Sequence, residues 1–140
     1  MIKKINHVGI AVKDIDSAIE FFEHVYEAAL VWRIKYEDQQ IDSALIAIGE
    51  SRIEITASLD PQSSVAKFIS ARGEGIHHIS LEVERFDQVI EGFRMKGLTI
   101  VAETDTEDFK AAFIHPSSNL GLLTEIIEPK KDEHSLGGKR

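Results

Sequence analysis

The sequence repeats itself with a period of 71 residues. His7 and His78 are 71 positions apart, as are Glu54 and Glu125, so each histidine precedes its glutamate by 47 residues. The flanking residues follow the same shift, since NHVGIAV aligns with HHISLEV and IEI aligns with TEI. A long internal period of this kind is typical of two copies of one supersecondary unit. The chain is therefore expected to contain two related modules.

Each copy of the repeat is predicted to fold as β-α-β-β-β. Its first strand is rich in β-branched residues. The helix that follows has apolar residues at helical spacing, with Asp14 or Asp16 as the cap in the first copy and Gly97 at the end of the second. The predicted strands cover residues 5–12, 31–36, 43–48 and 52–57 in the first copy, and 76–83, 99–102, 111–114 and 122–127 in the second.

The two modules are expected to pair, because one helix covers only one face of a four-stranded sheet. The predicted fold is therefore α+β, with tandem β-α-β-β-β modules joined in a curved eight-stranded sheet around a metal-binding cleft. A chain of 140 residues is long enough for one domain with a sizeable core. The predicted divisions are module one at 1–60, a linker helix at 61–74, module two at 75–128 and a flexible tail at 129–140.

The composition narrows the classes of partner. The 24 acidic and 16 basic residues give a net charge of −8, which opposes binding to nucleic acid and to anionic membranes. The chain has no cysteine, which excludes disulfides and thiolate ligands. No segment approaches the ~18 apolar residues of a membrane span, and the first residues lack the apolar core of a signal peptide. We expect a soluble, cytoplasmic protein.

The repeated histidines and glutamates are the candidate metal ligands. A lone histidine in an apolar strand is more often structural, and strand alternation could point Glu54 and Glu125 at solvent. The same 71-residue shift relates the two histidines and the two glutamates, which makes a purely structural role for these residues less favourable. Two imidazoles and two carboxylates suit Zn²⁺, Co²⁺, Ni²⁺ or Mn²⁺ and leave coordination positions open for water or substrate. We therefore predict one divalent ion per chain, held by His7, Glu54, His78 and Glu125.

The other histidines have weaker claims to a site. His77 alternates to the opposite strand face from His78, which favours packing or a hydrogen bond to a ligand. His24 is predicted to lie on a helix surface, and His134 falls in the tail. His115 ends a predicted strand beside the loop that continues to Gly121, so it is a candidate substrate contact.

These residues resemble the vicinal oxygen chelate (glyoxalase/bleomycin resistance/dioxygenase) superfamily, and within it most closely the methylmalonyl-CoA epimerase family. The likeness covers nearly the whole chain except the tail. Its quoted segments are NHVGIAV, SSVAKFISARGEGIHHISLEV and FIHPSSNLGLLTEIIE. By position, His7, His78 and Glu125 match the family's metal ligands, and Glu54 matches a site where the family has glutamine or glutamate. The resemblance also implies a homodimer, and an unpaired edge on the strand NHVGIAV would favour one.

The activity that the resemblance implies is epimerisation of a 2-methyl-branched acyl-CoA through a metal-stabilised enolate. Epimerisation needs acid/base groups on both faces of the planar intermediate, and Glu125 and Glu54 are the candidates. Ser43 stands where similar epimerases carry a glutamate base, and Ser117 stands where the family commonly has lysine. With His115, these two serines are the candidate substrate-binding residues. The loop 104–110 is shorter than the glycine-rich loop of the family.

Three alternatives remain within the same resemblance. A glyoxalase I-type lyase would use the same four ligands, but such enzymes usually carry an Asp-Pro-Asp-Gly turn where this chain has HPSSNLG. An extradiol dioxygenase would use two histidines and one carboxylate for Fe²⁺, which leaves Glu54 without a role. Non-catalytic small-molecule binding and resistance proteins of the superfamily typically lack the metal ligands.

Overall fold

The computed structural model describes residues 1–131, and the last nine positions of the predicted tail lie outside the described residues. The chain divides into two compact units. The N-terminal unit consists of residues 7–77, and the C-terminal unit consists of residues 1–6 with the described residues from 78 onward. Two strands, β1 (Ile2–Ala11) and β5 (Gly75–Val83), contribute residues to both units.

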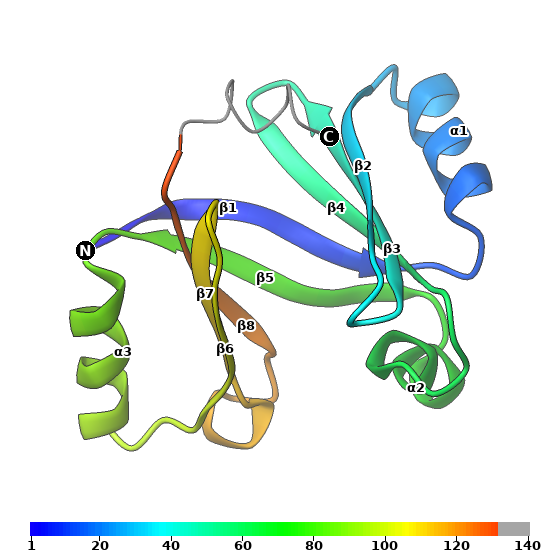
Figure 1. The fold of residues 1–140 in the computed structure, drawn as a ribbon. Coiled ribbons are helices and arrows are strands. Elements are labelled where there is room, and N and C mark those ends of the chain that lie inside the picture. The colour runs from blue at the N-terminus through cyan, green and yellow to red at the C-terminus, as the bar shows by residue number, and fades with distance from the viewer. Residues whose placement is uncertain (132–140) are drawn as a thin grey trace. The chain divides into compact units, whose positions relative to one another are not determined.

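The N-terminal unit packs α1 (Ile15–Val25) against β2 (Ala29–Tyr36), β3 (Ile41–Ile48) and β4 (Ser51–Ser58), as Figure 1 shows. The Asp14 side chain caps the helix by accepting a hydrogen bond of 3.1 Å from the Ser17 backbone N–H. The buried face of α1 meets the sheet through Ile15, Ile19, Phe22, Ala44, Ile46 and Ile55. Burial of each larger side chain contributes about 1.5–3 kcal/mol. The linker helix α2 (Ser64–Arg72) packs against β4.

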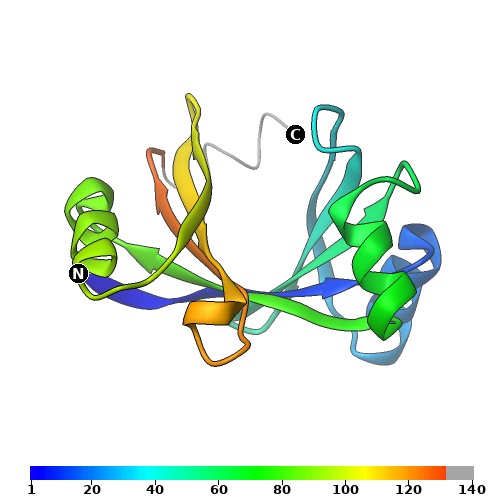
Figure 2. The same cartoon turned by 90° about the horizontal axis from the view of Figure 1, so that it is seen from below.

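The C-terminal unit repeats this plan with α3 (Phe86–Met95), β6 (Ile100–Asp105), β7 (Phe109–Ile114) and β8 (Thr124–Pro129), which are visible again in Figure 2. A single 3₁₀ turn, Pro116–Ser118, lies between β7 and β8. The Glu128 carboxylate accepts backbone hydrogen bonds from Arg85 (2.9 Å) and Phe86 (3.0 Å) at the start of α3. The core combines Phe86, Val89 and Ile90 with Ala112, Ile114 and Ile126.

The strand registers confirm the internal duplication. β1 and β4 run parallel with Gly9 opposite Glu54, and β5 and β8 run parallel with Ser80 opposite Glu125. The second pairing is the first one shifted by 71 residues on both strands. Glu54 and Glu125 therefore occupy equivalent positions on β4 and β8, as the sequence repeat predicts.

The eight strands are hydrogen-bonded in the order β2-β3-β4-β1-β5-β8-β7-β6. Together with the helices, this order confirms the predicted α+β class and the eight-stranded sheet. It also corrects the reasoning behind the predicted homodimer, because β1 lies inside the strand order and β2 and β6 are at its ends. The unpaired edge that was expected at NHVGIAV does not exist, and the homodimer itself stays a prediction.

The ends of the elements differ modestly from the sequence prediction. The linker helix α2 covers Ser64–Arg72 within the predicted segment 61–74, whereas β1 begins at Ile2 and β8 continues through Pro129. Lys130 extends the ordered chain beyond β8, since its backbone N–H donates to the Asp108 carbonyl at 2.8 Å. The predicted tail thus begins with residues that are held in place. The division into modules within one domain stays a prediction. Within residues 1–131, each helix is too short or too polar to cross a membrane.

Candidate metal centre

The N-terminal unit brings His7 and Glu54 together. Gly9 lies directly opposite Glu54 in the β1–β4 pair, and strand alternation places His7 on the same face as Gly9. The His7 imidazole is only 5% exposed, and its Nε2 lies 3.8 Å from Glu54 Oε2. Two ligand atoms that each bond one cation at ~2.0–2.2 Å can be separated by up to roughly 4 Å. The pair is therefore close enough to share an ion.

One hydroxyl group is hydrogen-bonded to the Glu54 carboxylate, and a second is hydrogen-bonded to the first. Thr56 Oγ1 donates to Glu54 Oε1 at 3.4 Å, and Ser43 Oγ lies 3.2 Å from Thr56 Oγ1. Ser43, a predicted substrate contact, is thus buried and already hydrogen-bonded to Thr56. Its neighbour Asp42 binds the Arg33 guanidinium through both carboxylate oxygens, at 3.3 and 3.0 Å. Asp42 therefore has a structural partner and is a poor candidate for a proton carrier.

The C-terminal unit places His78 and Glu125 on the paired strands β5 and β8. The buried His78 ring meets the Phe113 ring edge-on, with centroids 5.8 Å apart. Ser80 Oγ donates to Glu125 Oε1 at 2.7 Å. Burial raises the pKa of the Glu125 carboxyl to about 7, while the hydrogen bond from Ser80 acts in the opposite direction. This carboxyl can therefore change its protonation state near neutral pH.

Three of the four predicted ligands form one group. The ligand atoms of His7, Glu54 and His78 lie within 4.8 Å of one another. Burial, and secondarily the positive charge of Arg52, lower the pKa of His7 to about 4, so its imidazole is neutral at pH 7 and keeps a lone pair for a metal. Two imidazoles and a carboxylate are donors that fit a divalent cation of the zinc, cobalt, nickel or manganese type. Glu125 is not part of this group, and its role as the fourth ligand stays a prediction.

The remaining candidates lie in several different places. His115 Nδ1 accepts from the Ser117 backbone N–H at 3.0 Å and lies 2.7 Å from Ser117 Oγ, so the two residues form one exposed turn. Their contact with substrate stays a prediction. His77 packs edge-on against Phe68, with ring centroids 4.8 Å apart, which confirms the predicted packing role. The exposed His24 confirms the predicted surface position. His134 lies outside the described residues.

Sequence reasoning missed Thr56 and Ser80 as neighbours of the glutamates. A signal for both was present, because Thr56 follows Glu54 by two residues and Ser80 follows His78 by two residues. Positions two apart in a strand share a face. Alternation therefore places both hydroxyls on the same strand faces as candidate ligands, although only the strand register shows that Ser80 lies opposite Glu125.

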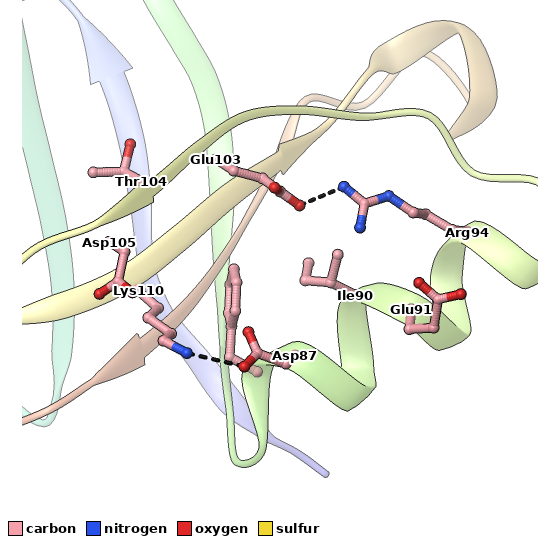
Figure 3. A pocket seen from close by; sticks show the side chains of 9 residues that line it. Asp87, Ile90, Glu91, Arg94, Glu103, Thr104, Asp105 and Lys110 are labelled. Carbon is pink, nitrogen blue, oxygen red and sulfur yellow. Dashed lines mark hydrogen bonds and ion pairs between the residues drawn. The ribbon is translucent and has the colours of Figure 1, made fainter.

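A separate pocket of about 400 Å³ lies in the C-terminal unit between α3 and the β6–β7 hairpin (Figure 3). Ion pairs cross it from Arg94 to Glu103 at 2.5 Å and from Lys110 to Asp87 at 3.0 Å. Its lining consists of Phe86, Asp87, Ile90, Glu91, Arg94, Glu103, Thr104, Asp105 and Lys110. The predicted ligands and substrate contacts are not among these residues, so the pocket is a different feature from the metal centre.

Comparisons with known protein sequences identify a family and a relative of this chain. The family model for the Glyoxalase/Bleomycin resistance protein/Dioxygenase superfamily matches residues 6–114. A relative from Bacillus subtilis (strain 168), the uncharacterized protein YqjC, is 28% identical over 135 residues, which cover 94% of this chain and 96% of the relative.

Solved structures similar to this chain include methylmalonyl-CoA epimerases. The methylmalonyl-CoA epimerase from Mycobacterium tuberculosis superposes with a TM-score of 0.87 at 32% identity, over 96% of this chain and 93% of that one. A variant of the methylmalonyl-CoA epimerase from Streptomyces coelicolor, in complex with 2-nitronate-propionyl-CoA, superposes with a TM-score of 0.88 at 25% identity. That match covers 94% of this chain and the whole of the other.

Proposed function

Because the chain belongs to the Glyoxalase/Bleomycin resistance protein/Dioxygenase superfamily, we propose that it is a metal-dependent epimerase of a 2-methyl-branched acyl-CoA. The observation that carries the proposal is the group formed by His7, Glu54 and His78, whose ligand atoms lie within 4.8 Å of one another. The similar structures from Mycobacterium tuberculosis and Streptomyces coelicolor support the reaction class, since both are methylmalonyl-CoA epimerases. The acyl-CoA substrate is supported by the ligand of the Streptomyces coelicolor structure.

The reaction must overcome the weak acidity of a proton α to a thioester carbonyl. A divalent cation would supply Lewis-acid stabilisation, worth several kcal/mol, of the negative charge that develops on the thioester oxygen. His7, Glu54, His78 and Glu125 would hold this cation. The neutral His7 imidazole suits this role because protonation would remove the lone pair that binds a metal.

The proton must leave one face of the substrate and return to the other, which requires groups that both accept and donate it. Glu125 suits this task when it is not bound to the cation, because burial then raises its pKa to about 7, where both protonation states are populated. Glu54 is the second candidate. A carboxylate that binds the cation acts as a base only when substrate displaces it, because coordination occupies its lone pairs and lowers its pKa.

One observation favours a second function. Ser43 occupies the position where similar epimerases carry a glutamate base, and here it is buried and hydrogen-bonded to Thr56. With Glu54 present as a carboxylate, the four predicted ligands are the His/Glu/His/Glu set of a glyoxalase I-type lyase. Such a lyase would move a proton between the two carbons of a thiol-derived hemithioacetal.

Exchange of the α-proton with heavy water tests these functions directly. The metal-free protein is loaded separately with Co²⁺, Ni²⁺, Zn²⁺ or Mn²⁺ and incubated in heavy water with a panel of acyl-CoAs, including methylmalonyl-CoA. We expect metal-dependent deuterium uptake by a 2-methyl-branched acyl-CoA, measured by mass spectrometry, and its loss in the His7→Ala, His78→Ala double variant. Conversion of a hemithioacetal without uptake into any acyl-CoA would overturn the epimerase in favour of the lyase.

A further inference from the structure

We propose that buried hydroxyl groups position both glutamates that are predicted as metal ligands: Thr56, supported by Ser43, holds Glu54, and Ser80 holds Glu125. This inference rests on the proposed metal-dependent function and adds the residues that orient its carboxylates. Thr56, Ser43 and Ser80 are positioning residues, since each acts on the centre through a glutamate.

The N-terminal unit contains a directed chain of hydrogen bonds. An ionised Glu54 can only accept, so Thr56 must donate its single hydroxyl proton to Oε1 across 3.4 Å. That proton is then committed, so Ser43 must donate to Thr56 Oγ1 across 3.2 Å. Ser43 is 2% exposed and Thr56 is 7% exposed, so bulk water competes little for these bonds. Consecutive hydrogen bonds with a common direction polarise and strengthen one another.

In the C-terminal unit, a single, shorter hydrogen bond holds Glu125. Ser80 lies directly opposite Glu125 in the β5–β8 pair, and its Oγ is 2.7 Å from Glu125 Oε1. Hydroxyl–carboxylate bonds of this length are charge-assisted and about twice as strong as neutral ones. Ser80 is fully buried. Loss of its hydroxyl should therefore have a larger effect than loss of the Thr56 hydroxyl, whose bond is 3.4 Å long.

The two hydroxyls are not related by the internal repeat. The shift of 71 residues places Ser80 on Gly9 and places Thr56 on Ile127. The glutamates themselves are related by the shift, yet each receives its hydrogen bond from a different direction: Thr56 is two residues along the same strand, and Ser80 is on the neighbouring strand. Both glutamates therefore receive a hydroxyl hydrogen bond, but from positions that the repeat does not relate. Duplication of one ancestral contact does not account for this, which indicates that each glutamate needs a hydroxyl partner.

The physical effect of these contacts is on carboxylate orientation. A carboxylate rotates about its terminal bond, and a hydrogen bond to one oxygen restricts that rotation. In the N-terminal unit, Thr56 binds Oε1 of Glu54, while Oε2 of the same carboxylate lies 3.8 Å from His7 Nε2. Groups that orient metal ligands in this way typically change metal affinity 10–100-fold when they are removed.

Titration of the metal-free protein with Co²⁺ tests the proposal, with the dissociation constant and the visible absorption spectrum as readouts. We expect Ser80→Ala and Thr56→Val to weaken Co²⁺ binding by about 10–100-fold and to shift the spectrum, with the larger effect in Ser80→Ala. Thr56→Ser keeps the hydroxyl and should bind as the unaltered protein does. Ser58→Ala is the matched control, because it removes a hydroxyl that bonds Ser63 and the Asp60 carbonyl away from the glutamates.

The melting temperature of each metal-free variant separates a loss of folding from a loss of orientation, and Co²⁺ affinities are compared among folded variants. Unchanged affinity and spectrum in both Ser80→Ala and Thr56→Val would overturn the proposal. Equal weakening by Thr56→Ser and Thr56→Val would overturn the Thr56 part, because the methyl group would then be responsible. Co²⁺ binding requires no substrate. An absence of acyl-CoA exchange would therefore refute the proposed function while the affinities still decide this inference.

Discussion

Replacement of Glu54 by glutamine tests whether this residue only binds the metal or also carries a proton. Glutamine preserves the size of the side chain and one neutral oxygen ligand, but it cannot accept a proton from substrate. Thr56 donates to Oε1 across 3.4 Å, so the amide oxygen is expected to take that place. The amide nitrogen would then replace Oε2, which lies 3.8 Å from His7 Nε2. An amide nitrogen is a donor and does not bind a cation in this position.

The expected magnitudes follow from this geometry. Metal affinity should fall, because the new amide must rotate its oxygen toward the cation and give up the Thr56 bond. A fall of about 10–100-fold is comparable to the loss of an orienting group, and excess metal restores occupancy. If Glu54 carries a proton, exchange at saturating metal should fall by ~10²–10⁴-fold, which corresponds to about 2.7–5.5 kcal/mol in the activation barrier.

The measurement is the rate of deuterium uptake into the acyl-CoA, at metal concentrations that saturate each variant. Glu50→Gln is the matched control, because Glu50 lies exposed in the turn before β4 and its loss should leave exchange unchanged. Near-normal exchange in fully metal-loaded Glu54→Gln would refute the two-glutamate scheme. Glu54 would then be a ligand alone, and a bound water would become the next candidate for the second acid/base group.

Four further outcomes are expected. The His7→Ala, His78→Ala double variant should lose the near-stoichiometric metal of the reconstituted protein in elemental analysis, and equal metal content would refute the ligand assignment. Burial raises the pKa of Glu125 to about 7, so its carboxyl must lose a proton before it binds a cation. Metal affinity measured by calorimetry should therefore fall about tenfold for each pH unit between pH 7 and pH 5. An affinity that does not change over this pH range would contradict a ligand role for Glu125. Ile126→Ala should cost about 2–5 kcal/mol in denaturant unfolding, against little for the exposed Leu120→Ala. Light scattering should report a dimer, and a clean 15.7 kDa species would count against it.

The internal repeat made much of the fold predictable. Period and strand pattern together indicated two β-α-β-β-β modules, because burial of one face of a sheet imposes an alternation that is visible locally. The position of β1 within the sheet was not predictable in the same way. Strand neighbours depend on hydrogen bonds between residues far apart in the chain, and the apolar pattern of NHVGIAV is the same for an edge strand as for an interior one.

The candidate site shows the same division between local and long-range information. The candidate ligands His7, Glu54 and His78 could be selected from spacing alone, since duplication preserved the distance in sequence between each histidine and its glutamate. The contact between Ser80 and Glu125 joins residues 45 positions apart and follows from the register of β5 and β8. The pKa of Glu125 follows from burial, which depends on the packed structure. Such properties cannot be derived from the identity of a residue and its sequence neighbours.

The division of β1 between the two units has a consequence for fragments of this protein. The Glu84 backbone N–H donates to the Met1 carbonyl at 2.9 Å, Asn6 donates to Glu82 at 2.8 Å, and the Lys3 ammonium lies 3.5 Å from Glu82. A fragment cut at the boundary between the sequence repeats, beginning at Gly75, would lack these partners along β5. We therefore expect that the second repeat does not fold on its own, and that a split version of this protein needs the first six residues supplied to its C-terminal fragment.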